Sequence, residues 1–269
     1  MQSMTALVLA ASRQGAEDAV AQLQHASHKC LIEIDGVVML ERVVRELKAS
    51  KYVDRIVVSI ESEELLLQTP VIAEMFKAGE ILFSQSQSDL FQSITHAVET
   101  VDAPYPLLVS TGDNALHTTE MVDYFCEEAL GKGNDAAVAM TPADVILEAY
   151  PDGKRAFHDL RDGGWSSCNL YGVLSDKAID AARAFETGGQ FGKKPERILK
   201  AFGLSFLIKY KFALTSLDGL AGHLSKRWNI KLVSVRMPFA DAPIDVDNVG
   251  DFHRTEKILR ARRGAAEPA

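Results

Sequence analysis

The sequence predicts an α/β fold with a doubly wound, mostly parallel sheet, because strand-like and helix-like segments alternate along its first half. Residues 5–11 form an almost continuous apolar run, which is typical of a strand buried on both faces of a parallel sheet. Residues 36–50 then carry apolar side chains at helical spacing. Hydrophobic residues make up 47% of the 269 positions and charged residues 25%, so the chain can bury the core of a large globular domain.

The remaining elements of the first half follow in the same alternation. Further strands are predicted over 54–60, 80–84, 105–110 and 135–142, and further helices over 63–77, 88–101 and 118–130. Pro70 interrupts or restarts the helix over 63–77, and Ser88 or Asp89 caps the next helix.

The second half, from residue 143, is less regular. Strands are predicted over 157–160, 167–174 and 230–236, and helices over 176–186, 195–222 and 249–263. Turns are expected at 151–153 and at Gly163-Gly164, a Gly- and Lys-rich loop over 187–195, and a helix break at Gly203. Without an internal linker, one domain over residues 1–264 fits best, with a lid-like second half and a disordered tail at 265–269.

The net charge of −8 argues against a general nucleic-acid or membrane-surface binder. Cys30, Cys126 and Cys168 form no CxxC pair, so we expect neither a disulfide framework nor a zinc site, and a reducing cytoplasm is the natural setting. We identify no signal peptide and no apolar stretch long enough to cross a bilayer.

The loop after the first strand, residues 11–31, is a candidate anion site. Small residues let backbone N–H groups approach a phosphate closely, and Arg13 and Lys29 add positive charge there. The small residues are Ala10, Ala11, Ser12 and Gly15. The loop matches neither GxxxxGK[ST] nor GxGxxG. The alternative is an ordinary connection in which both cations are solvated.

Two acidic segments are candidate metal ligands. Asp113 follows the fourth strand, where a carboxylate is well placed for Mg²⁺, although an Asx turn that caps the next helix explains it equally well. Asp245 and Asp247 flank Val246, and alternation places both carboxylates on one side of an extended segment. The alternative for this pair is a solvated acidic loop.

The second half supplies a candidate site for a phosphorylated acceptor. Its members are Ser167, Asn169, Lys193, Lys194 and Arg197. In an acidic protein a compact basic cluster favours anion binding, although a solubilising loop is the commoner role of such a cluster. The histidines show no spacing such as HExxH, and His28 is placed beside Lys29 to touch a phosphate.

Taken in order, these segments resemble the MobA-like NTP transferases, nucleotidyltransferases with a Rossmann-like, GT-A-type fold. The family's LAAGxxxRxG motif corresponds to residues 9–15, its K-x-L-x-x-x-x-G to 29–36, and its LLERVL helix to 39–44. Its GDxPL motif corresponds to residues 112–116, and its late DIDTPEDL motif to 245–252. The departures are Ser12 for a loop glycine, Ala115 for proline, and Asn248-Val249-Gly250 for Thr-Pro-Glu.

The resemblance implies that a nucleoside monophosphate moves from an NTP to a phosphorylated small-molecule acceptor, with release of pyrophosphate. It implies that Arg13 holds the β- and γ-phosphates, Lys29 holds the α-phosphate, and Asp113 and Asp247 hold Mg²⁺. Ser88 would lie near the base or the acceptor. Residues from 1 to about 142 would then bind the nucleotide, and residues from about 143 to 264 the acceptor.

Two other functions stay open from the sequence. A GT-A glycosyltransferase that uses a nucleotide-sugar usually carries a DxD motif after the fourth strand, whereas here that place holds Gly112-Asp113-Asn114 and the only comparable motif is late. The altered first loop also fits a non-catalytic nucleotide-binding protein. Neither the base, the acceptor nor the oligomeric state follows from the sequence.

Overall fold

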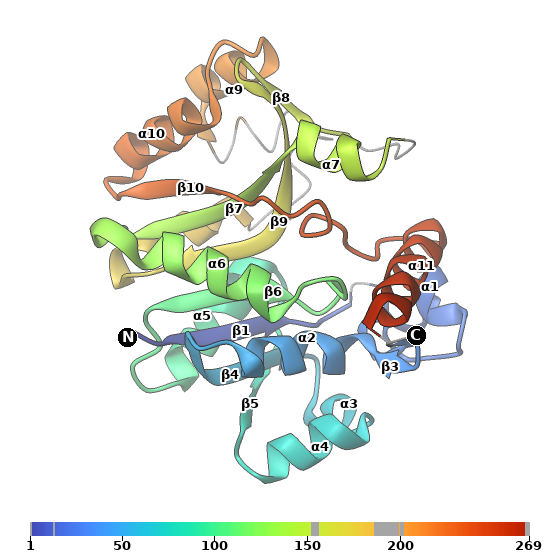
Figure 1. Ribbon diagram of the computed structural model, residues 1–269. Helices are drawn as coiled ribbons and strands as arrows, with labels where there is room; N and C mark the ends of the chain where they lie inside the picture. The colour runs from blue at the N-terminus through green and yellow to red at the C-terminus, as the bar shows by residue number, and fades with distance from the viewer. Residues whose placement is uncertain (1, 13, 152–155, 186–198, 200–201, 267–269) are drawn as a thin grey trace.

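Figure 1 shows the protein as a computed structural model, which describes residues 2–12, 14–151, 156–185, 199 and 202–266. One eight-stranded sheet runs through it in the order β10–β7–β9–β6–β1–β4–β5, with β8 paired to β9. These strands are β1 (Met4–Leu9), β4 (Val53–Ile60), β5 (Ile81–Gln85), β6 (Leu107–Thr111), β7 (Ala136–Pro142), β8 (His158–Leu160), β9 (Gly163–Val173) and β10 (Leu232–Arg236). A small second sheet joins β2 (Glu33–Ile34) to β3 (Val37–Val38).

The sheet is mostly parallel. β1 pairs in parallel with β4 and β6, β4 with β5, and β10 with β7. β9 lies between β6 and β7 and runs antiparallel to both. With helices on both faces this confirms the predicted mixed α/β fold with a mostly parallel sheet in one domain.

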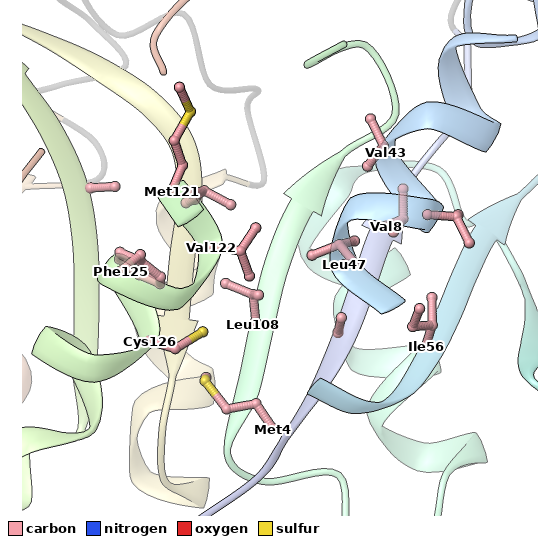
Figure 2. Close-up of a cluster of buried hydrophobic side chains, with 14 of the residues drawn as sticks. Met4, Val8, Val43, Leu47, Ile56, Leu108, Met121, Val122, Phe125 and Cys126 are labelled. Carbon is pink, nitrogen blue, oxygen red and sulfur yellow. The ribbon is translucent and has the colours of Figure 1, made fainter. Parts of the chain in front are cut away.

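One face of the sheet is covered by α2 (Met39–Ala49) and α6 (Thr119–Leu130), which also contact each other. Figure 2 shows part of the resulting core, in which Val122 and Phe125 of α6 and Leu108 of β6 belong to one cluster of buried side chains. Phe125 and Leu108 are fully buried. The apolar stripe of each helix therefore packs against this face of the sheet, and the burial of apolar surface stabilises the fold.

The opposite face is covered by a second set of helices. They are α5 (Leu90–Thr100), the 3₁₀ helix η4 (Asp176–Phe185), α9 (Leu204–Lys211) and α10 (Leu217–Trp228). α5 contacts β1, β4 and β5, η4 contacts β9, and α10 contacts β10. The strands present Leu7, Val109 and Val173 to this face, because successive side chains of a strand alternate between faces.

The remaining elements frame the edges of the sheet. They are η1 (Gly15–Glu17), α1 (Ala19–Gln22), η2 (Lys29–Leu31), α3 (Glu63–Leu66), α4 (Pro70–Lys77), η3 (Gly131–Gly133), α7 (Ala143–Ala149) and α11 (Val249–Ala266). Pro70 is the first residue of α4, and the Asp89 carboxylate caps α5 by accepting from the Gln92 N–H at 2.9 Å. Within the described part of the chain, no helix is both long and apolar enough to cross a membrane.

The structure differs from the sequence predictions at four places in the second half. Gly163 and Gly164 belong to β9 instead of a turn. Close packing explains the glycine at position 164, because a Cβ there would stand 3.0 Å from the Cβ of Ala143 and 3.1 Å from that of Phe157. α7 forms where no helix is predicted, and residues 212–216 separate α9 from α10. α11 extends to Ala266, so residues 265 and 266 are helical, as suits two alanines, and only 267–269 lie outside the described residues.

Candidate functional site

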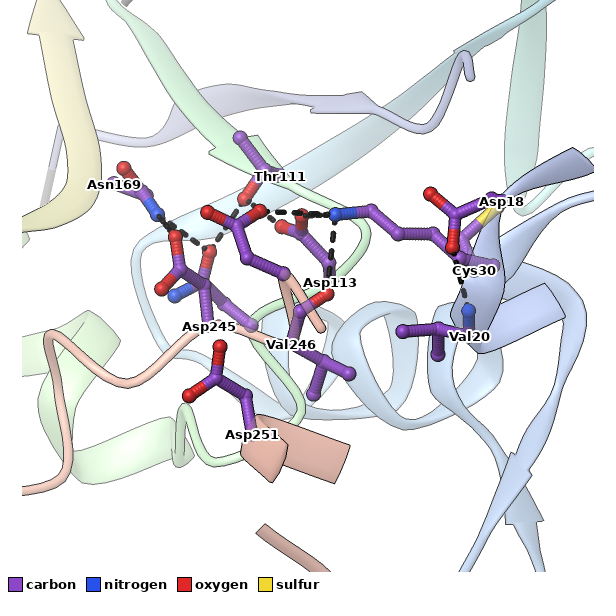
Figure 3. Close-up of polar contacts among 12 residues, drawn as sticks. Asp18, Val20, Cys30, Thr111, Asp113, Asn169, Asp245, Val246 and Asp251 are labelled. Carbon is purple, nitrogen blue, oxygen red and sulfur yellow. Dashed lines mark hydrogen bonds and ion pairs between the residues drawn. The ribbon is translucent and has the colours of Figure 1, made fainter. Parts of the chain in front are cut away.

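Three segments far apart in sequence meet beyond the carboxyl ends of β1 and β6. They are the loop after β1, the turn after β6 and the segment that precedes α11. The Val246 N–H donates to the Asp113 carbonyl at 3.1 Å, which ties the last two together, and Figure 3 shows the side chains that these segments bring to one place. This edge is where open α/β sheets commonly bind ligands.

Lys29 is the centre of the cluster. Its Nζ lies 2.6 Å from Oδ2 of Asp113 and 3.2 Å from Oδ1 of Asp247, and it donates to the Val246 carbonyl at 3.1 Å. Lys29 begins η2, and the buried Cys30 thiol beside it donates to the Ala10 carbonyl at 3.2 Å. The backbone of the first loop therefore aims the Lys29 ammonium at carboxylates from two other segments.

The Lys29 ammonium stays charged at neutral pH. Burial by itself lowers the pKa of Lys29, but the carboxylates of Asp113 and Asp247 raise it, and the net effect is a pKa above the ordinary lysine value. A fixed positive charge therefore stands at the edge of the sheet.

The turn after β6 holds Asp113 in one orientation. The Thr111 hydroxyl donates to Oδ1 of Asp113 at 2.6 Å and also contacts Oδ1 of the fully buried Asn114. Gly112 lets this turn approach the first loop, because a Cβ there would lie 3.3 Å from the Cβ of Ala10 and 3.4 Å from that of Cys30. The turn is thus built to place a carboxylate beside Lys29.

Asn169 is brought to the same edge by a bulge in β9. Val138 pairs with Tyr171 and Met140 pairs with Ser167, so β9 has two extra residues between these pairs, and Asn169 there has a left-handed φ of 53°. Its Nδ2 donates to Oδ1 of Asn114 at 3.2 Å and to Oδ2 of Asp245 at 3.1 Å. The bulge turns this amide toward the carboxylates, as Figure 3 shows.

Asp245 and Asp247 occupy different parts of the cluster. They flank the buried Val246, and Asp245 accepts from Asn169 whereas Asp247 pairs with Lys29. The Asp247 side chain is 52% exposed and that of Asp113 only 16%, so Asp113 is the more firmly enclosed partner of Lys29.

The first loop is contacted by a carboxylate that the sequence analysis missed, that of Glu61. Oε1 of Glu61 accepts from the Ser12 N–H at 2.7 Å, and Oε2 lies 3.1 Å from Nε2 of His28. The Gly15 N–H donates to the Ser12 hydroxyl at 2.9 Å, and Gly15 has a φ of 52°. Glu61 directly follows the last residue of β4 at the same sheet edge. A carboxylate directly after a predicted strand is the sequence feature that could have identified it.

The other predicted site residues are dispersed. Ala10 is buried, Ala11 is exposed, and Ser88 lies on the exposed turn before α5, where its hydroxyl donates to Gln92 at 2.9 Å. The Ser167 hydroxyl lies 3.1 Å from that of Tyr171. Four predicted residues lie outside the described part of the chain, namely Arg13, Lys193, Lys194 and Arg197.

Asp113 and Asp247 are the side chains best placed to hold a cation, because both already reach one ammonium. Among the described residues, no group of three or more His, Cys, Asp or Glu is arranged for a metal ion. Two carboxylates nevertheless suit Mg²⁺, which commonly takes one or two of them and completes its shell with water and substrate phosphates.

The ionisable nucleophiles near the cluster are not activated. Burial raises the pKa of the Cys30 thiol to about 12, and burial likewise raises the pKa of Tyr171 to about 12. Both groups are therefore protonated at neutral pH, and neither is prepared to form a covalent intermediate.

Comparisons with known proteins agree with this fold. The model of the MobA-like NTP transferase domain matches residues 6–189. A hypothetical transferase from Thermus thermophilus has a TM-score of 0.73 at 22% identity, covering 94% of this chain and all of that one. The 4-diphosphocytidyl-2C-methyl-D-erythritol synthase from Anaerococcus prevotii has a TM-score of 0.57 at 14% identity, covering 96% of each chain. These structures show the shared fold, and no curated protein sequence matches the chain.

Proposed function

The chain belongs to the MobA-like NTP transferase family, and we propose that it transfers a nucleoside monophosphate from an NTP to a phosphorylated small-molecule acceptor, releasing pyrophosphate. The observation that carries the proposal is the Lys29 ammonium, held between Asp113 and Asp247 beyond the ends of β1 and β6. A partly buried cation paired with oxygen ligands at this edge is suited to a triphosphate and its counter-ion.

The reaction is one in-line substitution. An oxygen of the acceptor phosphate forms a bond to the α-phosphorus of the NTP, and the bond from that phosphorus to the pyrophosphate oxygen breaks. The acceptor phosphate is already ionised, so the step needs no general base. Catalysis then rests on position and on charge stabilisation, and Lys29 is the group we assign to the α-phosphate oxygens.

Asp113 and Asp247 are the ligands we propose for Mg²⁺, with Asp245 as a third candidate. When bound, Mg²⁺ neutralises charge on the phosphate oxygens. A cation bound by Asp113 and Asp247 would compete with the Lys29 ammonium for their carboxylate oxygens. The ammonium would then be available to bind the triphosphate. Thr111 keeps Asp113 oriented in either state, because its hydroxyl donates to the other carboxylate oxygen.

We assign the first loop to the triphosphate and the second half of the chain to the acceptor. Ala10, Ala11, Ser12, Arg13 and Gly15 would line the triphosphate side, and Glu61 must give up the Ser12 N–H before a phosphate takes it. Asn169 and Ser167 lie on the acceptor side of the cluster. Ser88 stays a prediction for the base or acceptor, and Lys193, Lys194 and Arg197 stay predictions for the acceptor phosphate.

The test is pyrophosphate release with Mg²⁺, each of the four common NTPs, and a panel of sugar, polyol and cofactor phosphates. We expect release that requires one NTP and one acceptor together. Saturable NTP binding without release for any acceptor would identify a non-catalytic nucleotide-binding protein. Turnover of a nucleotide-sugar, with no turnover of NTPs, would identify a glycosyltransferase.

A further inference from the structure

A cavity of about 340 Å³ lies on the face of the sheet covered by α9 and α10. β6, β7 and β9 form its floor through side chains such as Val109, Val138 and Tyr171. Its roof comes from α9 and α10 and the residues before α9, and includes Phe202, Phe206, Leu220 and Trp228. The cavity is partly open to solvent, and a mostly apolar pocket of a few hundred Å³ is typical of a small-molecule site, so it is a candidate ligand site.

The chemistry of the cavity wall is apolar over most of its area. Among its described lining residues none is Asp, Glu, Lys or Arg. His158 is engaged with Tyr210, whose hydroxyl lies 2.6 Å from Nδ1 of His158. Such a wall cannot compensate the charges of a triphosphate or the many hydroxyls of a sugar, but it does favour a hydrocarbon chain or an aromatic ring.

Polar groups gather at one end of the cavity, where β6 ends. Three lining residues there are connected, because Ser167 and Asn169 both contact the Tyr171 hydroxyl, at 3.1 and 3.5 Å. Thr111 lines the cavity as well. Thr111 also donates to Asp113 at 2.6 Å, and Asn169 donates to Asp245 at 3.1 Å. The cavity and the candidate catalytic cluster therefore share two side chains.

We propose that this cavity holds the apolar body of the acceptor, so that the acceptor is an amphipathic phosphate with an alkyl chain or aromatic ring. Its phosphate lies at Thr111 and Asn169, next to the carboxylates, and its apolar part extends between the sheet and α10. The proposal rests on the proposed function, since the phosphate is the group that would attack the NTP.

The direct test is binding of a homologous series of methyl, butyl, hexyl and octyl phosphate. Trp228 lines the cavity and Trp165 is the only other tryptophan of the chain, so Trp fluorescence reports binding, and Trp228→Phe identifies the reporter. We expect the affinity to rise about three- to fourfold for each added methylene until the cavity is full. Equal affinity for all four phosphates would overturn the proposal.

A matched pair of variants locates the bound chain. Val138→Phe adds bulk on the cavity side of β7, and Val233→Phe makes the same change on the neighbouring strand β10, where Val233 packs in the opposite core. We expect Val138→Phe to weaken octyl phosphate at least about tenfold, as the loss of two methylene contacts implies. Methyl phosphate should bind both variants equally, and Val233→Phe should retain normal octyl phosphate binding.

If circular dichroism shows that Val138→Phe does not fold, Ser234→Phe takes its place, because it fills the same cavity from β10. Equal octyl phosphate binding by the cavity and control variants would overturn the assignment. NTP binding is measured separately by calorimetry. Chain-length-dependent binding without NTP binding would refute the proposed function alone, whereas NTP-dependent transfer to short phosphates without any chain-length effect would refute this inference alone.

Discussion

The two faces of the central sheet are covered in the same way but filled differently. Under α2 and α6, Phe125, Leu108 and their neighbours fill the space between sheet and helices. Under α9 and α10, equally apolar side chains such as Phe206 and Trp228 leave about 340 Å³ open. Apolar composition alone therefore does not mean a closed core.

The cavity and the edge of the sheet also differ in charge. The ionic groups stand at the edge where the strands end, and the described wall of the cavity carries no carboxylate, ammonium or guanidinium. Separation of the two environments lets one site hold a polyanion at the edge and an apolar group on one face. Each prediction below tests one part of this comparison.

The largest expected effect separates the two faces by stability. Phe125→Ala should cost about 3–5 kcal/mol of unfolding free energy, because the large side chain is fully buried in a filled core. Phe206→Ala should cost at least about 1 kcal/mol less, because one side of this ring already borders open space. Urea denaturation of both variants without ligand measures the difference. Equal costs would show that the second face is packed as fully as the first.

At the charged edge, Lys29→Ala should lower kcat/KM for transfer about 10²-fold or more, because the lost ammonium acts on charge that develops in the transition state. Lys51→Ala is the control, since Lys51 is half-exposed and pairs with Glu127, away from the cluster. Pyrophosphate release measures turnover, and thermal unfolding checks the fold. Near-normal turnover by a folded Lys29→Ala variant would remove Lys29 from the site.

The two ends of the carboxylate cluster should differ in metal binding. Asp113→Asn should weaken Mn²⁺ binding in the presence of an NTP at least about tenfold, because Asp113 is the enclosed partner of the cation. Asp245→Asn should weaken it less, since Oδ2 of Asp245 already accepts from Asn169. Electron paramagnetic resonance of Mn²⁺ titrations gives both affinities. Equal losses of Mn²⁺ affinity would show that Asp245 contributes to metal binding as much as Asp113 does.

The smallest expected effect concerns the first loop. Glu61→Gln should tighten NTP binding about fivefold, because it removes a repulsion of about 1 kcal/mol between the Glu61 carboxylate and the triphosphate. The amide oxygen of the glutamine would still accept from the Ser12 N–H. Calorimetric NTP titration of the variant against the parent measures this change. Weaker binding would show that the Glu61 carboxylate orders the loop for the nucleotide instead of competing with it.

The local pattern of the sequence determined most of the secondary structure of the first half. Apolar runs and helical periodicity placed β1, β4 and β6, and Pro70 and Asp89 marked the start of two helices. These signals are local, because hydrogen bonds, caps and amphipathic faces depend on residues a few positions apart. The ordered motifs identified Lys29, Asp113 and Asp247 as candidate site residues, but not their contacts.

The tertiary structure alone decided how the site is assembled. Lys29 meets Asp247 across 218 positions of sequence, Glu61 occupies the Ser12 N–H, and a bulge in an antiparallel strand turns Asn169 to the carboxylates. The cavity also belongs to this level, because it depends on how closely α9 and α10 approach the sheet. Such features arise from packing between segments distant in the chain, and local sequence patterns carry no measure of those distances.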